Sequence, residues 1–176
     1  MNCTVYIATS LDGFIARTDG GIDWLPAPAS GGEDYGYSEF MNTVDALVMG
    51  RHTFELAMTF GTWPYRKPVY VLTSRPESLP SLLPDRVRAL SGSPREVVET
   101  VRRDGCQHVY VDGGNTIQRF LRAGLVNRMI ITTIPVLIGT GIPLFGPLER
   151  DIALTHVGTR AYDDGLVQSE YRIPSA

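Results

Sequence analysis

The stretch Val44-Asp45-Ala46-Leu47-Val48-Met49-Gly50-Arg51-His52-Thr53-Phe54-Glu55 decides the fold of this chain. Its first half is an apolar run suited to a buried strand, and the residues from Phe54 to Met58 suit the start of a helix. At the junction, glycine lets the backbone approach a ligand and exposed amides at the helix start donate hydrogen bonds, while Arg51 and Thr53 add a charge and a hydroxyl. The stretch therefore predicts a strand-to-helix turn that binds an anion.

The overall composition is that of an ordinary globular protein. With 176 residues, 43% hydrophobic and 20% charged, the chain is long enough for one sizeable core and short for two, which predicts a single domain spanning residues 1–176. The net charge of -3 argues against nucleic acids and membrane surfaces as partners. No segment has the pattern of a secretory signal or a membrane span, so a cytoplasmic protein is expected.

Two further apolar runs, like the first, end in residues that could bind an anion. The run Val69–Thr73 is almost wholly apolar, as in strands covered on both faces, and it leads into Ser74-Arg75. The run Cys106–Val111 predicts another strand, followed by Asp112-Gly113-Gly114-Asn115-Thr116 and then by apolar residues at helical spacing as far as Gly124. The chain thus contains a second strand, glycine-turn, helix unit.

The remaining segments complete an α/β pattern. A first strand is expected over Cys3–Thr9, a helix from Glu33-Asp34 towards Val44, and a helix opening at Ser93-Pro94-Arg95-Glu96, where serine and glutamate form a capping box. Residues 152–162 and 166–173 predict a closing antiparallel hairpin. The fold expected is a three-layer α/β domain, with a mixed, mostly parallel β-sheet flanked by helices.

In open sheets of this kind, ligands bind at the carboxyl ends of the strands. Gly50–Thr53 and Gly113–Thr116 can present backbone amides to phosphate oxygens, and Thr73–Arg75 adds two hydroxyls and a guanidinium. One strand-glycine-helix turn is more often structural than functional, but two such turns and a Ser-Arg strand end together predict a dinucleotide site. Neither turn has the Gly-x-Gly-x-x-Gly pattern. An arginine at the third strand end favours NADP over NAD.

These motifs resemble those of a known family. Met49–Glu55, Thr73-Ser74-Arg75 and Val111–Gly114 look like the cofactor motifs of the dihydrofolate reductase superfamily, in the same order. Ser10–Ala16 and Pro135–Phe145 look more like one branch, which contains the reductase domain of the bifunctional riboflavin-biosynthesis deaminase/reductase and its stand-alone relatives. The resemblance covers nearly the whole chain.

The resemblance implies a dihydrofolate reductase-like fold, NADPH bound across the strand ends, and hydride transfer to a pterin- or pyrimidine-like ring or to a sugar. It also implies a cis peptide bond between Gly113 and Gly114, and it makes a homodimer plausible. The residues implied in cofactor binding are Gly50, Arg51 and Thr53 at the pyrophosphate, Thr73, Ser74 and Arg75 at the ribose phosphate, and Gly113, Gly114, Asn115, Thr116 and Ile117 towards the nicotinamide.

The substrate side is less determined. Asp34 lies 49 − 34 = 15 positions before Met49, close to the spacing of the acidic residue that protonates the pterin in dihydrofolate reductases, and Trp24 resembles the tryptophan ahead of that helix. An acidic residue also suits any helix N-terminus. Three hypotheses follow: a reductase of the riboflavin branch, in which the loop Leu11–Trp24 closes over the nicotinamide; a true dihydrofolate reductase that uses Asp34; and a regulatory module that binds NADPH without turnover.

The remaining candidate residues have simpler interpretations. His108 and His156 lie in expected strands without nearby ligand-type partners in sequence, so no metal site is predicted. Cys3 and Cys106 are expected to be small buried residues. Hydride transfer needs no protein nucleophile, only a donor and an acceptor held face to face and a source of a proton.

Overall fold

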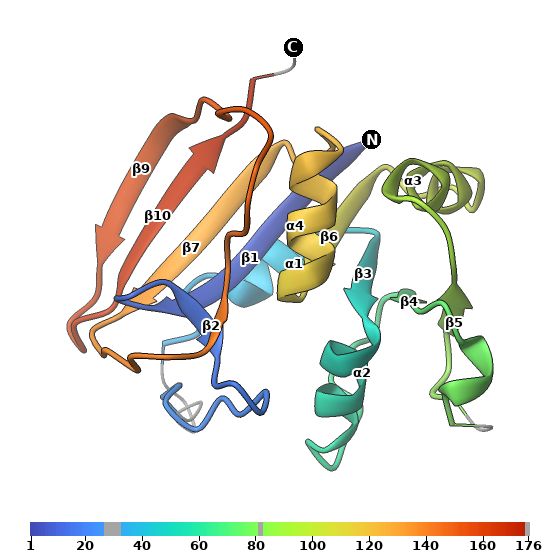
Figure 1. The fold of residues 1–176 in the computed structure, drawn as a ribbon, viewed down its shortest axis with the longest axis horizontal. Coiled ribbons are helices and arrows are strands. Elements are labelled where there is room, and N and C mark those ends of the chain that lie inside the picture. Colours follow the sequence, from blue (N-terminus) through green and yellow to red (C-terminus); the bar gives the residue numbers. More distant parts are fainter. Residues whose placement is uncertain (27–32, 81–82, 175–176) are drawn as a thin grey trace.

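The computed structural model describes residues 1–26, 33–80 and 83–174, and an eight-stranded sheet runs through the molecule (Figure 1). The first six strands in the order below are parallel, and the last two are antiparallel to their neighbours. The prediction of a mixed, mostly parallel sheet with a C-terminal hairpin is therefore confirmed. In sheet order, the strands are β5 (Val87–Leu90), β4 (Val69–Leu72), β3 (Ala46–Gly50), β6 (His108–Asp112), β1 (Asn2–Ser10), β7 (Arg128–Ile134), β10 (Val167–Arg172) and β9 (Thr155–Ala161).

Helices cover both faces of this sheet. Phe40 and Phe54, from α1 and α2, pack in one apolar cluster, and Ile117 and Phe120 of α4 pack in another together with valines of α3. In Figure 1, α4 lies in front of the sheet and α1 behind it. Burying a large apolar side chain contributes about 1.5–3 kcal/mol, which explains why β3 is apolar on both faces. The helices are α1 (Tyr37–Thr43), α2 (Arg51–Met58), α3 (Pro94–Arg103) and α4 (Gly114–Arg122), with a 3-10 turn at Pro76–Ser78.

The start of α3 follows the predicted capping box. The backbone N–H of Ser93 donates to the Glu96 carboxylate at 2.7 Å, and the Ser93 hydroxyl oxygen accepts from the N–H of Glu96. Two of the free amides at this helix start are thereby satisfied by side chains.

The expected start of α1 is wrong by several residues. The helix begins at Tyr37, because Tyr35 and Gly36 both have positive φ, of 57° and 85°, and break the helical path. The Asp34 carboxylate lies just before this turn and accepts the N–H groups of Gly36 at 2.9 Å and Ser38 at 3.0 Å. The acidic residue therefore closes the turn ahead of the helix.

A second, two-stranded sheet joins segments that look like loops in the sequence. β2 (Phe14–Ala16) pairs antiparallel with β8 (Ile142–Pro143). Asp12, in the turn ahead of β2, accepts the N–H of Gly139 at 2.7 Å and so anchors the segment that leads to β8. The loop expected over Leu11–Trp24 therefore contains a short strand, which the sequence does not reveal because its pairing joins residues more than 120 positions apart.

Three other expectations concern local backbone, cysteines and membrane spans. The predicted cis bond between Gly113 and Gly114 is wrong, because no peptide bond among the described residues is cis. The turn after β6 is made instead by the positive φ of Gly113, 87°, a conformation open to glycine. Cys3 and Cys106 are both free and buried, as expected. Across residues 1–26, 33–80 and 83–174, no helix is long and apolar enough to cross a membrane.

Candidate active site

The three strand ends identified from the sequence meet in one cleft of about 730 Å³. Because β4, β3 and β6 are parallel neighbours, their carboxyl ends reach the same edge of the sheet. All but one of the predicted cofactor-binding residues line this cleft. They are Gly50, Arg51, Thr53, Thr73, Ser74, Arg75, Gly113, Gly114, Asn115 and Thr116, and their role in binding a cofactor stays a prediction.

The exception is Ile117. Its side chain is fully buried in the cluster around Phe120, and its backbone N–H donates to the carbonyl of Gly113 at 2.9 Å. Neither its side chain nor its amide is free to contact a ligand. Ile117 therefore packs α4 on the sheet, and a part for it in cofactor binding stays a prediction that this burial does not favour.

The two glycine turns interlock at the base of the cleft. A Cβ placed on Gly113 would overlap the Thr53 hydroxyl, and a Cβ placed on Gly50 would lie 3.1 Å from the Thr116 hydroxyl oxygen. Each turn therefore leaves out a side chain where the other turn supplies a threonine. This reciprocal arrangement holds the starts of α2 and α4 together beneath the cleft, which neither turn reveals in sequence alone.

The starts of α2 and α4 carry free hydrogen-bond donors. Neither helix has a side chain that caps its first amides, whereas α3 is capped by Ser93. Uncapped N–H groups and the positive end of the helix dipole together favour an anion. Arg51 adds a guanidinium at the start of α2, where it pairs with Glu55 at 3.0 Å. The base of the cleft is thus suited to phosphate groups.

Arginines extend this positive region away from the glycine turns. Arg75 is exposed just beyond β4, where its backbone N–H donates to the Thr73 hydroxyl at 3.1 Å. Arg119, one turn into α4, also lines the cleft, and its guanidinium donates to the carbonyl of Gly92 at 2.8 Å. The sequence reasoning missed Arg119, although its position three residues after Thr116 places it on the same face of the helix.

Asp112 lies in one of the sequence motifs, but its role is apparent only in the structure. It ends β6, lines the cleft, and accepts the N–H of Gly113 at 2.8 Å. Burial raises the pKa of this carboxyl from 3.8 to about 6, and the hydrogen bond from Gly113 opposes the shift. An acidic residue closing an otherwise apolar strand is the signal that would have found it.

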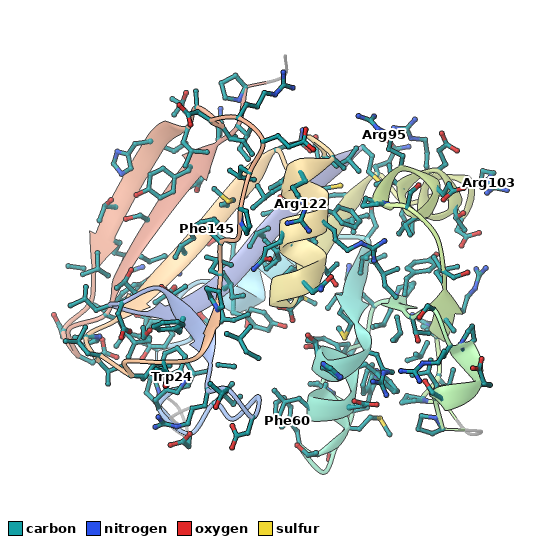
Figure 2. The ribbon with its side chains drawn as sticks, viewed as in Figure 1. Trp24, Phe60, Arg95, Arg103, Arg122 and Phe145 are labelled. Atoms are coloured by element: carbon teal, nitrogen blue, oxygen red, sulfur yellow. The ribbon has the colours of Figure 1, made fainter. Side chains whose placement is uncertain are left out.

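The other half of the cleft is mostly apolar. Ile15 of β2 approaches α4 so closely that its Cδ1 would lie 2.8 Å from a Cβ on Gly114. Tyr65 lies near Asp112, and burial raises the pKa of its phenol far above the usual value. Phe60, just beyond α2, lies at the foot of the molecule in Figure 2, on the same side as the loop after β2. The lining residues of this half are Ile7, Ala8, Ile15, Ala16, Gly20, Ile22, Leu25 and Tyr65.

The two predicted substrate residues are placed differently. Neither Asp34 nor Trp24 lines the cleft. Hydrogen bonds from Ser38 and Gly36 lower the pKa of Asp34, so that the carboxyl stays ionised where it caps the turn before α1. The structure gives Asp34 a structural role, and a part for Asp34 or Trp24 in substrate binding stays a prediction.

The histidine in β6 is occupied by structural contacts. The His108 ring lies 2.8 Å from the Thr4 hydroxyl and 2.9 Å from the carbonyl of Thr43. Within the part of the chain that the structure describes, no group of three or more His, Cys, Asp or Glu side chains is placed to hold a metal ion.

Comparisons with known proteins agree with this architecture. The model of the RibD C-terminal domain family matches residues 2–168. A crystal structure of a protein from Shewanella sp. PV-4, named after riboflavin biosynthesis, is 39% identical, covers 99% of each chain and superposes with a TM-score of 0.92.

Two more distant structures share the fold. One is the diaminohydroxyphosphoribosylaminopyrimidine deaminase/5-amino-6-(5-phosphoribosylamino)uracil reductase of Thermotoga maritima, at 13% identity and TM-score 0.76, of which the match covers 56%, with 98% of this chain. The other is Enterococcus faecalis dihydrofolate reductase in complex with NADP(H), at 17% identity and TM-score 0.66, covering 98% of this chain and 96% of that one. The dihydrofolate reductase-like fold predicted from the sequence is thereby confirmed.

Proposed function

Because the chain belongs to the RibD C-terminal domain family, we propose that it is an NADPH-dependent reductase that transfers a hydride to a small ring or carbonyl compound. The observation that carries the proposal is the pairing of two uncapped helix starts on interlocked glycine turns, with an arginine at the next strand end, all along one cleft. Such a row of donors matches a ligand with phosphates at its middle and at one end.

The order of the strands supports one orientation for the cofactor. Arg75 follows β4, the glycine turns follow β3 and β6, and β1 comes next in the sheet. Neighbouring strands lie about 4.8 Å apart, so these four strands span roughly 14 Å. Arg75 would meet the ribose phosphate, the starts of α2 and α4 the pyrophosphate, and the half lined by β1 and β2 the nicotinamide. When bound there, NADPH supplies the hydride.

The protein's own contribution to the chemistry is then positioning and a proton. The apolar half of the cleft excludes water and holds the acceptor against the cofactor. Asp112 faces the same cleft with a pKa raised to about 6. Near neutral pH its carboxyl still carries a proton part of the time, so we assign it the role of proton source for the acceptor.

The dihydrofolate reductase alternative rests on Asp34, whose carboxylate is occupied by the N–H groups of Gly36 and Ser38 outside the cleft. It predicts dihydrofolate-dependent NADPH oxidation that collapses in Asp34→Asn. The regulatory alternative predicts tight NADPH binding without turnover on any pterin, flavin precursor or small carbonyl compound. A steady-state assay with such a panel separates both from the proposal.

The test of the proposal is a titration of NADPH and NADH into wild type, Arg75→Ala and Arg122→Ala. Loss of a charge-assisted contact costs roughly 1.5–3 kcal/mol, or about a 10- to 150-fold rise in Kd, and we expect it in Arg75→Ala for NADPH only. Arg122, on α4 (Figure 2), is exposed and does not line the cleft, so its removal should change neither affinity. Equal weakening of both cofactors would contradict the role of Arg75. Failure of wild type to bind either one would refute the proposed function.

A further inference from the structure

The positive charge of the cleft lies in one half only. The cationic side chains that line it are Arg51 on α2, Arg75 beyond β4 and Arg119 on α4. Arg119 is held towards Gly92, which follows β5, on the far side of the cleft from β1. All three guanidiniums therefore belong to the side where the cofactor phosphates are proposed to bind.

The half formed by β1, β2 and the following loop carries no cation among its described lining residues. The segments 27–32, 81–82 and 175–176 contain no Lys, Arg or His in their sequence, so they cannot supply one. The single lysine of the chain, Lys67, comes just before β4, at the amino end of that strand. The cleft lies at the carboxyl ends of the parallel strands, so Lys67 is on the opposite side of the sheet from it. An anionic acceptor would find no counter-charge here.

The cation nearest to this half in sequence is already paired. Arg17 directly follows β2, and its guanidinium donates two hydrogen bonds to Asp23, at 2.6 and 2.8 Å. Arg17 is not a lining residue, and the same loop carries Asp19 and Asp23. Because Asp23 is itself neutralised by Arg17, the carboxylates left in this region are those of Asp19 and of Asp112 in the cleft, and they repel an anion.

We infer that the hydride acceptor of this protein is not an anion: it is an uncharged, planar ring or carbonyl compound without phosphate or carboxylate. The inference rests on the proposed function, which identifies this half as the acceptor site. Ile7, Ile15 and Ile22 provide apolar walls for a flat ring, while Asp112 and Tyr65 provide polar groups that orient it. The Thermotoga reductase acts, by its name, on a phosphoribosylamino compound; this cleft lacks the charges that such an acceptor would require.

The inference is tested by mapping inorganic phosphate onto the protein by amide NMR, with and without saturating NADP+. In the free protein, we expect phosphate to shift the amides at the starts of α2 and α4. With NADP+ bound, we expect no saturable shift at Ile7, Ala8, Ala16 or Ile22 up to about 20 mM phosphate, a concentration at which a site with a Kd of about 1 mM would be almost fully occupied. Saturable shifts at these residues would overturn the inference.

Two variants make the result decisive. Ile22→Arg places a cation in the acceptor half, and it should gain a saturable phosphate response there; no gain would show that charge does not decide what binds, and would overturn the argument. Arg17→Ala should leave the wild-type map unchanged. If wild type does show a saturable phosphate response in the acceptor half and Arg17→Ala loses it, Arg17 leaves Asp23 to bind the anion, and the inference is overturned. If NADP+ itself shifts no amide, the proposed function fails, while the phosphate map of the free protein still tests the charge of the acceptor half.

Discussion

The interlock between the glycine turns predicts a specific cost for adding one methyl group at Gly113. In Gly113→Ala, the new Cβ meets the Thr53 hydroxyl, and the residue must also keep a φ of 87° with a ψ of 135°. The backbone conformation costs a non-glycine residue about 1–3 kcal/mol, and overpacking adds about 1–3 kcal/mol. We therefore expect the free energy of unfolding to fall by about 2–6 kcal/mol.

The matched control is Gly165→Ala, in the turn between β9 and β10. Gly165 has a similar φ of 86°, but a Cβ there meets only Pro135, at an ordinary distance of 3.7 Å. This variant should lose only the cost of the left-handed backbone, about 1–2 kcal/mol. Urea unfolding measures both, provided that the dependence on denaturant is the same in every variant.

A double-mutant cycle with Thr53→Ala isolates the contact itself. Removing the Thr53 hydroxyl should recover the overpacking part of the loss in Gly113→Ala, which gives a coupling energy of about 1–3 kcal/mol. The backbone part should remain. If Gly113→Ala costs no more than Gly165→Ala and shows no coupling to Thr53→Ala, the two turns do not interlock, and the description of the cleft base is wrong.

Two further predictions concern carboxylates. The pKa of Asp112 is about 6 in the folded protein, against an ordinary value of 3.8. Between about pH 4 and 6 the folded state therefore binds more protons than the unfolded state, and the free energy of unfolding should fall as the pH rises through this range. Asp112→Asn should abolish this pH dependence in equilibrium unfolding. If Asp112 is the proton source, the variant should also lose the fall in turnover above about pH 6. A pH profile of turnover that matches wild type would contradict that role. Asp34→Asn should destabilise the protein by about 0.5–2 kcal/mol, as for a weakened helix cap, and should change turnover by no more than about twofold. A collapse of turnover with unchanged stability would instead indicate that Asp34 takes part in the reaction.

The two glycine turns of the cleft could be located from the sequence because their signals are short-range. The turn at Gly50 and the turn at Gly113 each join a buried strand to a helix within a few residues, and apolar periodicity located both elements. What the sequence could not show is that Thr53 and Thr116 fill the space left by the opposite glycine. That contact joins residues some 60 positions apart.

The other half of the cleft was harder to predict, because it depends on contacts between residues far apart in the sequence. It is built from β1, from β2 and from the loop after β2, and β2 is completed only by β8, near the other end of the chain. Asp12 fixes this arrangement through the backbone N–H of Gly139, a contact that places no demand on the side chains around it. Ile22 lies in the loop after β2 and has no contact with the glycine turns among those described above, whereas Ile15 packs directly against Gly114. Each strand-to-helix turn is local in sequence, whereas the half of the cleft formed by β1 and β2 depends on a distant pairing, so the proposed acceptor has to be inferred from the charges and lining residues of that half.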